Sequence, residues 1–233
     1  MRHDTKGRSK TDYCHSLFFG KAPSFHVKNF YATTSLLLIF FIGSAGVQNA
    51  AEPPPNERVQ ALTNTRATYC SAPRKPDGRV DTERLVSELI EAGANTYSFC
   101  IHNYATDWDD LHLILPRARQ CGIRIWGSIV PPSESPPRLK AYAEPFRLDY
   151  KRWAVEFARL SLRETNLVAW SIDDFTHKLK TYTPEYVKDM LDAAREINPR
   201  LAFVPCCYFP AITKRFATNY CSLLDGILFP YRH

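Results

Sequence analysis

The chain has 233 residues, of which 45% are hydrophobic and 23% are charged, and its formal net charge is +6. Residues 1–50 hold six of the 30 Lys and Arg side chains and two of the 24 Asp and Glu side chains, so residues 51–233 are nearly neutral. A nearly neutral folded part gives no electrostatic case for nucleic-acid binding, because such proteins carry a clear excess of basic charge. The length suits one domain of ordinary size with an appendage.

The N-terminal segment has the pattern of an export signal. Basic residues precede an apolar run from Ser35 to Val47, and small residues occur at Gly43–Ala45 and again at Ala50. The apolar core of roughly a dozen residues is shorter than the roughly 20 that cross a bilayer. A basic leader, a short apolar core and small residues are typical of a secretory signal peptide. We therefore expect residues 1–50 to be a leader and signal peptide, with the cleavage site left open. The mature chain would be secreted or periplasmic and would have no membrane span, with an uncleaved membrane anchor as the alternative.

From residue 66 onward, strand patterns alternate with helix patterns. Residues 51–65 are predicted to be a linker, because three consecutive prolines favour extended backbone. Strands are predicted over 66–72, 95–103, 123–130, 167–172, 201–209 and 225–231. Helices are predicted over 82–92, 107–120, 150–164, 184–197 and 212–219. Asp81 is a good N-cap for the first helix, and Pro184 occupies the first position of the fourth.

This alternation predicts an α/β domain with a parallel sheet covered by helices. No phosphate-binding glycine loop follows any predicted strand, which disfavours a nucleotide-binding sheet. We therefore expect residues 66–233 to form a parallel (β/α) TIM-type barrel. The six predicted strands fall short of the roughly eight that close such a barrel. We expect the barrel to be incomplete and the reading frame to be truncated at its C-terminus.

The cysteines give no sign of a disulfide framework or a metal site. Seven are present, and Cys14 lies in the leader. Four of the others fall inside predicted strands, where a free thiol behaves as a small apolar group: Cys70, Cys100, Cys206 and Cys207. No C-x-x-C pair or His/Cys cluster occurs. We therefore expect free thiols, no metal and no cofactor, and the sequence leaves the oligomeric state open.

The candidate site centres on two adjacent carboxylates, Asp173 and Asp174, directly after the strand 167–172. Proteins of the α/β class place functional groups at the carboxyl ends of parallel strands. Because strand side chains alternate, the large members should face the helices and the small ones the barrel interior. The outward set is Val168, Trp170 and Ile172, and the inward set is Ala169, Ser171 and Asp173. We predict Asp173 as the catalytic residue in the barrel mouth, with Asp174 at the rim as a second catalytic candidate. The alternative is a turn cap at Asp174 and a solvated loop acid at Asp173.

Other polar and aromatic residues that follow the predicted strands would share this mouth. The predicted substrate-binding residues are His102, Asn103, Trp108, Tyr208, Tyr231 and Arg232. Carboxylates surrounded by aromatic rings and hydrogen-bonding side chains suit a sugar, whose ring faces stack on aromatic rings while its hydroxyls take polar partners. His102 equally suits a core histidine bonded to the backbone, because His is of intermediate burial. Glu134 follows the third predicted strand and so belongs near the mouth, but among Ser and Pro residues it suits a surface loop acid better than a catalyst.

The order of elements, the export pattern and the strand ending W-S-I-D-D-F at 170–175 resemble secreted TIM-barrel glycoside-hydrolase-like proteins. The resemblance covers about residues 60–233 and implies a general acid/base at Asp173 or Asp174, after the fourth strand. It also implies a second carboxylate after a seventh strand, beyond the end of this sequence. The chitinase-like motif D-x-x-D-x-D-x-E is not matched, because Phe175 and Thr176 follow the acidic pair.

A weaker similarity is to the metal-dependent polysaccharide deacetylases, whose opening motif is T-F-D-D-G-P. It rests on Ser171–Phe175 followed by Tyr182–Glu185, and it implies Asp173 as base and Asp174 as metal ligand. The H-[ST]-x-x-H motif that would supply histidine ligands does not follow, so too few ligands remain for a metal. Three functions stay open: a glycoside-hydrolase-like enzyme, a non-catalytic sugar-binding or scaffold barrel, and a deacetylase-like hydrolase. Each of these functions implies a carbohydrate or glycan as partner. The sequence identifies neither the sugar nor the linkage.

Overall fold

The computed structural model describes residues 15–18, 56–137 and 142–230. The apolar run of the predicted export signal at 35–47 and the predicted binding residues Tyr231 and Arg232 lie outside the described residues. No helix within the described ranges is long and apolar enough to cross a bilayer.

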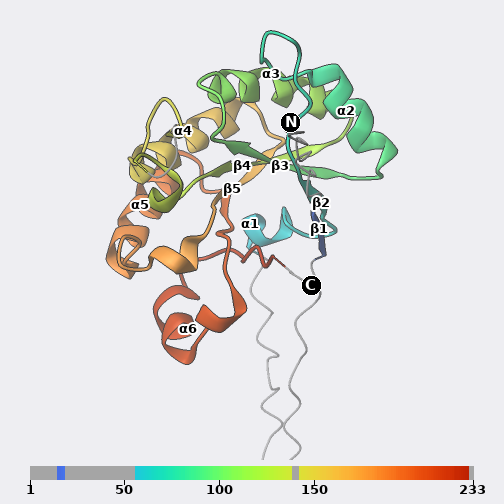
Figure 1. Ribbon diagram of the computed structural model, residues 1–233. Helices are drawn as coiled ribbons and strands as arrows, with labels where there is room; N and C mark the ends of the chain where they lie inside the picture. Colours follow the sequence, from blue (N-terminus) through green and yellow to red (C-terminus); the bar gives the residue numbers. More distant parts are fainter. Residues whose placement is uncertain (1–14, 19–55, 138–141, 231–233) are drawn as a thin grey trace, which may run out of the picture. The chain divides into compact units, whose positions relative to one another are not determined.

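One sheet of six strands, arranged in chain order, organises the described residues. The strands are β1 (His15–Phe18), β2 (Arg66–Tyr69), β3 (Thr96–Ile101), β4 (Arg124–Ile129), β5 (Leu167–Ile172) and β6 (Ala202–Phe203). Strands β2 to β6 each pair in parallel with the next, and β1 pairs antiparallel with β2. The predicted parallel α/β fold is therefore confirmed. The sheet is open within the described residues, because β1 and β6 are its two ends (Figure 1).

Helices alternate with the parallel strands as predicted. They are α1 (Glu57–Gln60), α2 (Thr82–Glu91), α3 (Asp107–Gln120), α4 (Tyr150–Arg163), α5 (Pro184–Ile197) and α6 (Lys214–Tyr220). Three short 3-10 helices follow strand ends: η1 (Pro132–Glu134), η2 (Phe175–Lys178) and η3 (Phe209–Ala211). Figure 1 shows α2 to α5 along the outer side of the sheet, with α1 on the inner side.

Side-chain caps explain where the long helices begin. The carboxylate of Asp81 accepts a hydrogen bond from the N–H of Arg84, and Asp149 caps α4 in the same way. Thr183 caps α5, with Pro184 at its first position. Each cap satisfies an N–H that has no partner inside the helix. The starts of α2 and α5 therefore agree with the sequence prediction.

The sheet buries side chains on both of its faces. Trp170 on β5 lies in the core between sheet and helices, 5.8 Å from the ring of Phe157 on α4. Ala169 lies in a second cluster on the inner side, together with Trp126. The predicted orientation of Trp170 is confirmed. The prediction for Val168 is wrong, because a register shift between β4 and β5 breaks the alternation there and Val168 packs with the inner cluster.

A glycine in β4 allows helix α4 to approach the sheet closely. A β-carbon built at Gly127 would lie 2.3 Å from Cε1 of Phe157, far inside van der Waals contact. Phe157 is completely buried against Trp170 and Trp153. The absence of a side chain at Gly127 therefore sets the depth to which α4 packs on the sheet.

Two segments differ from the sequence prediction. Within its described residues, 225–230, the predicted strand 225–231 contributes one bridge, between Cys206 and Leu228. Gly226 and Pro230 explain this, because glycine weakens a strand and proline cannot donate to a ladder. Residues 57–65 pack as part of the domain rather than as a linker: Arg58 forms an ion pair with Asp225 at 2.7 Å, and Leu62 is buried in the inner cluster.

Candidate functional site

Asp173 directly follows β5 and faces the inner side of the sheet. Its N–H donates to the carbonyl oxygen of Ile129 at 2.9 Å, which extends the pairing of β5 with β4 by one residue. Its Oδ2 accepts a hydrogen bond from the phenolic O–H of Tyr69 at 3.2 Å. Tyr69 ends β2 and packs against the inner cluster. The predicted inward orientation of Asp173 is therefore confirmed.

Asp174 is held at the rim by a different set of contacts. Its backbone is left-handed, with φ of 48°, and its N–H donates to Oδ1 of Asp173 at 2.9 Å. Asp tolerates this conformation better than most residues. Its Oδ1 accepts a short hydrogen bond from the phenolic O–H of Tyr208, and Nδ1 of His177 lies 3.7 Å from its Oδ2. The rings of His177 and Tyr208 stack at 4.4 Å.

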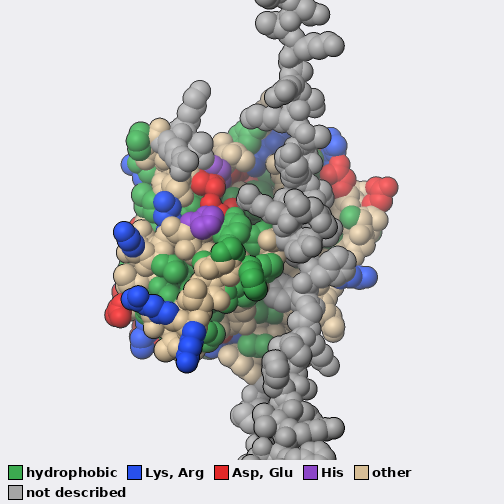
Figure 2. Space-filling model, turned by 60° about the horizontal axis from the view of Figure 1, so that its bottom comes forward, with side chains coloured by type: hydrophobic (Ala, Val, Ile, Leu, Met, Phe, Trp, Pro, Cys, Tyr) green, Lys and Arg blue, Asp and Glu red, His purple; other side chains and the backbone are tan. Residues whose placement is uncertain are grey.

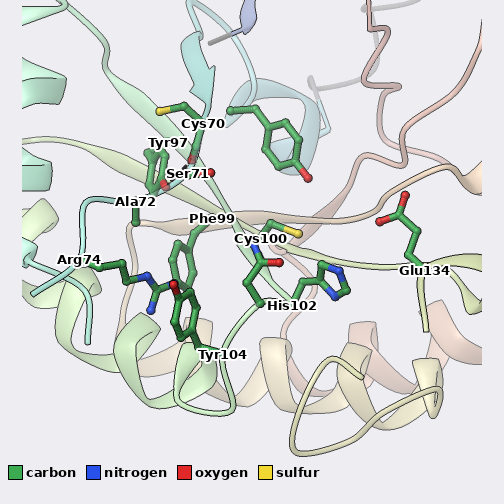
Figure 3. Close-up of a pocket in the computed structure, with 12 residues that line it drawn as sticks. Cys70, Ser71, Ala72, Arg74, Tyr97, Phe99, Cys100, His102, Tyr104 and Glu134 are labelled. Atoms are coloured by element: carbon green, nitrogen blue, oxygen red, sulfur yellow. Dashed lines mark hydrogen bonds between the residues drawn. The ribbon is translucent and has the colours of Figure 1, made fainter. Parts of the chain in front are cut away.

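A cavity of about 730 Å³, which we call the Tyr69 cavity, lies beside the contact between Tyr69 and Asp173. Its size is typical of pockets that take small molecules. The lining comes from β2, from β3 and from the loops after β2, β3 and β4: Tyr69–Ala72, Arg74, Tyr97, Phe99, Cys100, His102–Tyr104 and Glu134. Figure 3 shows Arg74 and Tyr104 at one end of the cavity and Glu134 at the other, with His102 between them.

One buried carboxylate fixes two loops of this cavity. Oδ2 of Asp107 accepts the N–H groups of His102 and Tyr104 at 2.9 and 3.0 Å. Its Oδ1 accepts a hydrogen bond from Arg74 at 2.6 Å. The side chain of Asp107 is fully buried. The loop after β3 and the loop after β2 are therefore held to the same residue at the start of α3.

The electrostatic environment of the cavity is governed by its carboxylates. Burial raises the pKa of the Cys100 thiol, and the nearby charges of Asp173 and Glu134 raise that pKa further. Burial also raises the pKa of Tyr69, with Cys100 and Asp173 adding to the effect. A group whose pKa is raised by neighbouring charges experiences a negative potential. The end of the cavity next to Asp173 is therefore electronegative.

His102 lines the cavity and has a buried ring nitrogen. Its Nδ1 is buried and makes no hydrogen bond to another described residue. Burial lowers the pKa of its imidazole, against the opposing charges of Asp107 and Asp173. A neutral imidazole offers one donor and one acceptor.

The structure brings together some of the predicted binding residues and separates others. His102 and Asn103 line the Tyr69 cavity, and Tyr208 contacts Asp174. The prediction for Trp108 is wrong: its ring lies 5.3 Å from Trp153 and packs between α3 and α4. Apolar residues one helical turn apart form the core-facing side of a helix, and Trp108 is on that side of α3.

Three further cavity residues were not selected as binding residues in the sequence analysis. Tyr69 was not selected, although it is the last residue of a predicted strand and therefore at a strand end. Tyr104 lines the cavity two residues after His102. Glu134, which the sequence favoured as a loop acid rather than a catalyst, also lines the cavity. Proximity to strand ends was the available signal in all three cases.

The cysteines and acidic residues gather in no metal-binding arrangement. Within residues 56–137 and 142–230, no three His, Cys, Asp or Glu side chains are placed to hold an ion together. The six cysteines of these ranges are free thiols. Burial raises the pKa of Cys206, with the charge of Asp173 adding to it. Burial raises that of Cys207 to about 12.

Comparison with known proteins identifies no family. No protein-family model matches the chain, and no curated protein matches it. Several solved structures are similar. The endoglucanase Cel5A of Pseudomonas stutzeri has 13% identity and a TM-score of 0.42, over 68% of this chain and 56% of that one. The HMG-CoA lyase of Brucella melitensis has 17% identity and a TM-score of 0.39, over 66% of this chain and 57% of that one.

A third similar structure is a calcium-binding mutant of β-glucuronidase 2 from Bacteroides uniformis, with 12% identity and a TM-score of 0.42. The similarity covers 64% of this chain and 18% of the β-glucuronidase. This chain thus spans less than two thirds of each of the three structures. The similar structures include glycoside hydrolases, in agreement with the resemblance noted in the sequence, and they also include a lyase. The functional assignment therefore rests on the site.

Proposed function

We propose that this chain is a carbohydrate-active protein that binds a sugar in the Tyr69 cavity and hydrolyses a glycosidic bond with Asp173. The hydrogen bond from Tyr69 to Asp173 carries the proposal. It connects a carboxylate at a strand end to a residue that lines a cavity of about 730 Å³. Aromatic rings and polar groups line the same space, as a sugar requires of its site.

Glycoside hydrolysis needs two carboxyl groups on opposite sides of the scissile bond. One donates a proton to the glycosidic oxygen as the bond to the anomeric carbon breaks. The other assists the group that attacks the anomeric carbon. We assign the proton transfer to Glu134, which lines the cavity, and the second role to the carboxylate of Asp173, which lies beside it. Asp174 is a weaker candidate, because Tyr208 and His177 already surround its carboxylate.

A panel of oligosaccharides tests this proposal with the full chain. Binding is measured by calorimetry, and cleavage is measured as newly formed reducing ends. We expect at least one member of the panel to bind and to be cleaved. Binding without cleavage of any member would replace the hydrolase by a non-catalytic sugar-binding barrel. No binding to any member would reject the carbohydrate function altogether.

We also propose that the chain is exported to the periplasm or the cell exterior. The support is the basic leader before the apolar run at 35–47 and the near-neutral remainder. Cleavage after this run would remove His15–Phe18, the strand that pairs with the edge of β2. Sequencing the N-terminus of the protein recovered from its native host tests the proposal. A cytoplasmic product that retains Met1 would contradict it.

A further inference from the structure

Arg74 is the one Lys or Arg among the described residues that line the Tyr69 cavity. Its charge is balanced by two buried carboxylates: one guanidinium nitrogen is 2.6 Å from Asp107 and the other is 3.1 Å from Asp110. Arg79 makes a further ion pair with Asp110. Two guanidinium groups and two carboxylates therefore form a cluster of no net charge. A cation so engaged has little attraction left for an anionic ligand.

The opposite situation holds at Asp173. No ion pair between described residues includes this carboxylate, which accepts hydrogen bonds from the O–H of Tyr69 and the N–H of Asp174. Hydrogen bonds stabilise a carboxylate without cancelling its charge. The raised pKa of the Cys100 thiol, to which Asp173 contributes, reports the same negative potential inside the cavity. The cavity therefore repels anions at the end where the proposed chemistry takes place.

Tyr104 supplies a flat ring at the other end. The guanidinium carbon of Arg74 lies 4.0 Å from the centre of its ring, over one face. The residue is 44% exposed, so part of its side chain remains open to a ligand. Asp107 accepts the N–H of Tyr104 and also binds Arg74, so ring and guanidinium are held to one anchor. The close-up in Figure 3 shows the ring beside Arg74.

We propose that the Tyr69 cavity is a subsite for a neutral or amino sugar, whose ring stacks on Tyr104, and that it discriminates against uronic acids. This inference rests on the proposed carbohydrate function and names its substrate class. A preorganised aromatic face provides the stacking surface. The balanced Arg74 cluster and the charge of Asp173 together disfavour a sugar carboxylate.

The stacking part is tested with cellobiose as probe. Tyr104→Ala is expected to weaken binding about tenfold, the upper range for one aromatic contact, and Tyr104→Phe to retain it. Leu113→Ala, on an exposed apolar residue of α3, is the matched control and is expected to bind as the wild type does. Circular dichroism shows which variants are folded. If Tyr104→Ala binds cellobiose as well as the wild type does, the stacking role is wrong.

The charge part is tested with three disaccharides: cellobiose, its diglucosamine counterpart and one that contains glucuronic acid. The wild type is expected to bind the first two and to bind the uronide at least about fivefold more weakly, the effect of one unit charge at close range in water. Asp173→Asn is expected to reduce the difference in affinity between cellobiose and the uronide by about the same factor. Equal binding of all three by the wild type would overturn the inference and leave the carbohydrate function standing. No binding of any sugar would overturn both.

Discussion

The phenolic oxygen of Tyr69 lies 3.2 Å from Oδ2 of Asp173 and so connects β2 to the end of β5 across the inner side of the sheet. These strands are not neighbours, because β3 and β4 lie between them. The contact therefore depends on the curvature of the sheet. It places the carboxylate beside the Tyr69 cavity.

Tyr69→Phe should lower turnover more than it lowers the stability of the folded chain. The variant loses one hydrogen bond to a charged group, worth about 1.5–3 kcal/mol at most. A carboxylate that is no longer oriented should lower turnover by about tenfold or more. Urea unfolding and the rate of reducing-end formation measure the two effects. Tyr186→Phe, which removes the hydroxyl of a tyrosine on α5, should leave turnover unchanged. Unchanged turnover in Tyr69→Phe would remove the orienting role from Tyr69.

Asp107→Asn should be strongly destabilising. The buried carboxylate accepts two backbone N–H groups and pairs with Arg74, and its loss leaves that guanidinium partly uncompensated. Breaking a buried ion pair costs about 3–5 kcal/mol. Asp109→Asn is the matched control, because Asp109 lies on the same helical turn and is exposed. Denaturant unfolding should separate the two variants, and equal stabilities would show that Asp107 does not anchor the loops.

The helix-facing and inner sides of the sheet were largely predictable from the sequence. The alternation of large and small residues predicted that Trp170 faces the helices and that Asp173 faces inward. Successive side chains of a strand point to opposite faces of the sheet, so the pattern determines the orientation of both residues. Val168 could not be predicted, since the register shift beside it depends on how β4 and β5 pair. The parallel order of the strands followed from the alternation of strands and helices.

The composition of the cavity was harder to predict. Trp108 was selected as a binding residue although its spacing from Leu111 and Leu115 already marks it as part of a core-facing helix side. Tyr104 lies on a loop, where no periodicity indicates orientation. Its place at the cavity depends on Arg74 and Asp107, residues that are far apart in the sequence and meet only in the folded chain.

Gly127→Ala should destabilise the domain through overpacking. The new methyl group would lie 2.3 Å from an atom of Phe157, which is completely buried and cannot move freely. Overpacking of this kind costs about 1–3 kcal/mol or more. Adding Phe157→Leu should recover part of the loss, because the two changes act on one contact. A double variant no more stable than the sum of the single changes would argue against this clash.

The stability of the domain should fall as the pH drops below about 6.5, the ordinary pKa of histidine. Burial lowers the pKa of both His102 and His112 in the folded chain. Below that pH the unfolded chain binds protons at these sites that the folded chain resists, so protonation favours unfolding. His102→Gln and His112→Gln should each make the unfolding midpoint less dependent on pH between pH 7.5 and pH 5.5. An unchanged dependence in both variants would contradict the assignment.

The rate at which Asp173→Asn cleaves an oligosaccharide that the wild type cleaves tests the central claim most directly. Loss of a carboxyl group that acts in general acid–base catalysis lowers the rate by about 10²–10⁴-fold, and we predict a loss of that size with an unfolding midpoint close to that of the wild type. Asp189→Asn, an exposed carboxylate on α5 paired with Lys151, should keep full activity. Full activity in Asp173→Asn would contradict the account, and the carboxylate responsible would then have to be sought at Asp174 or Glu134.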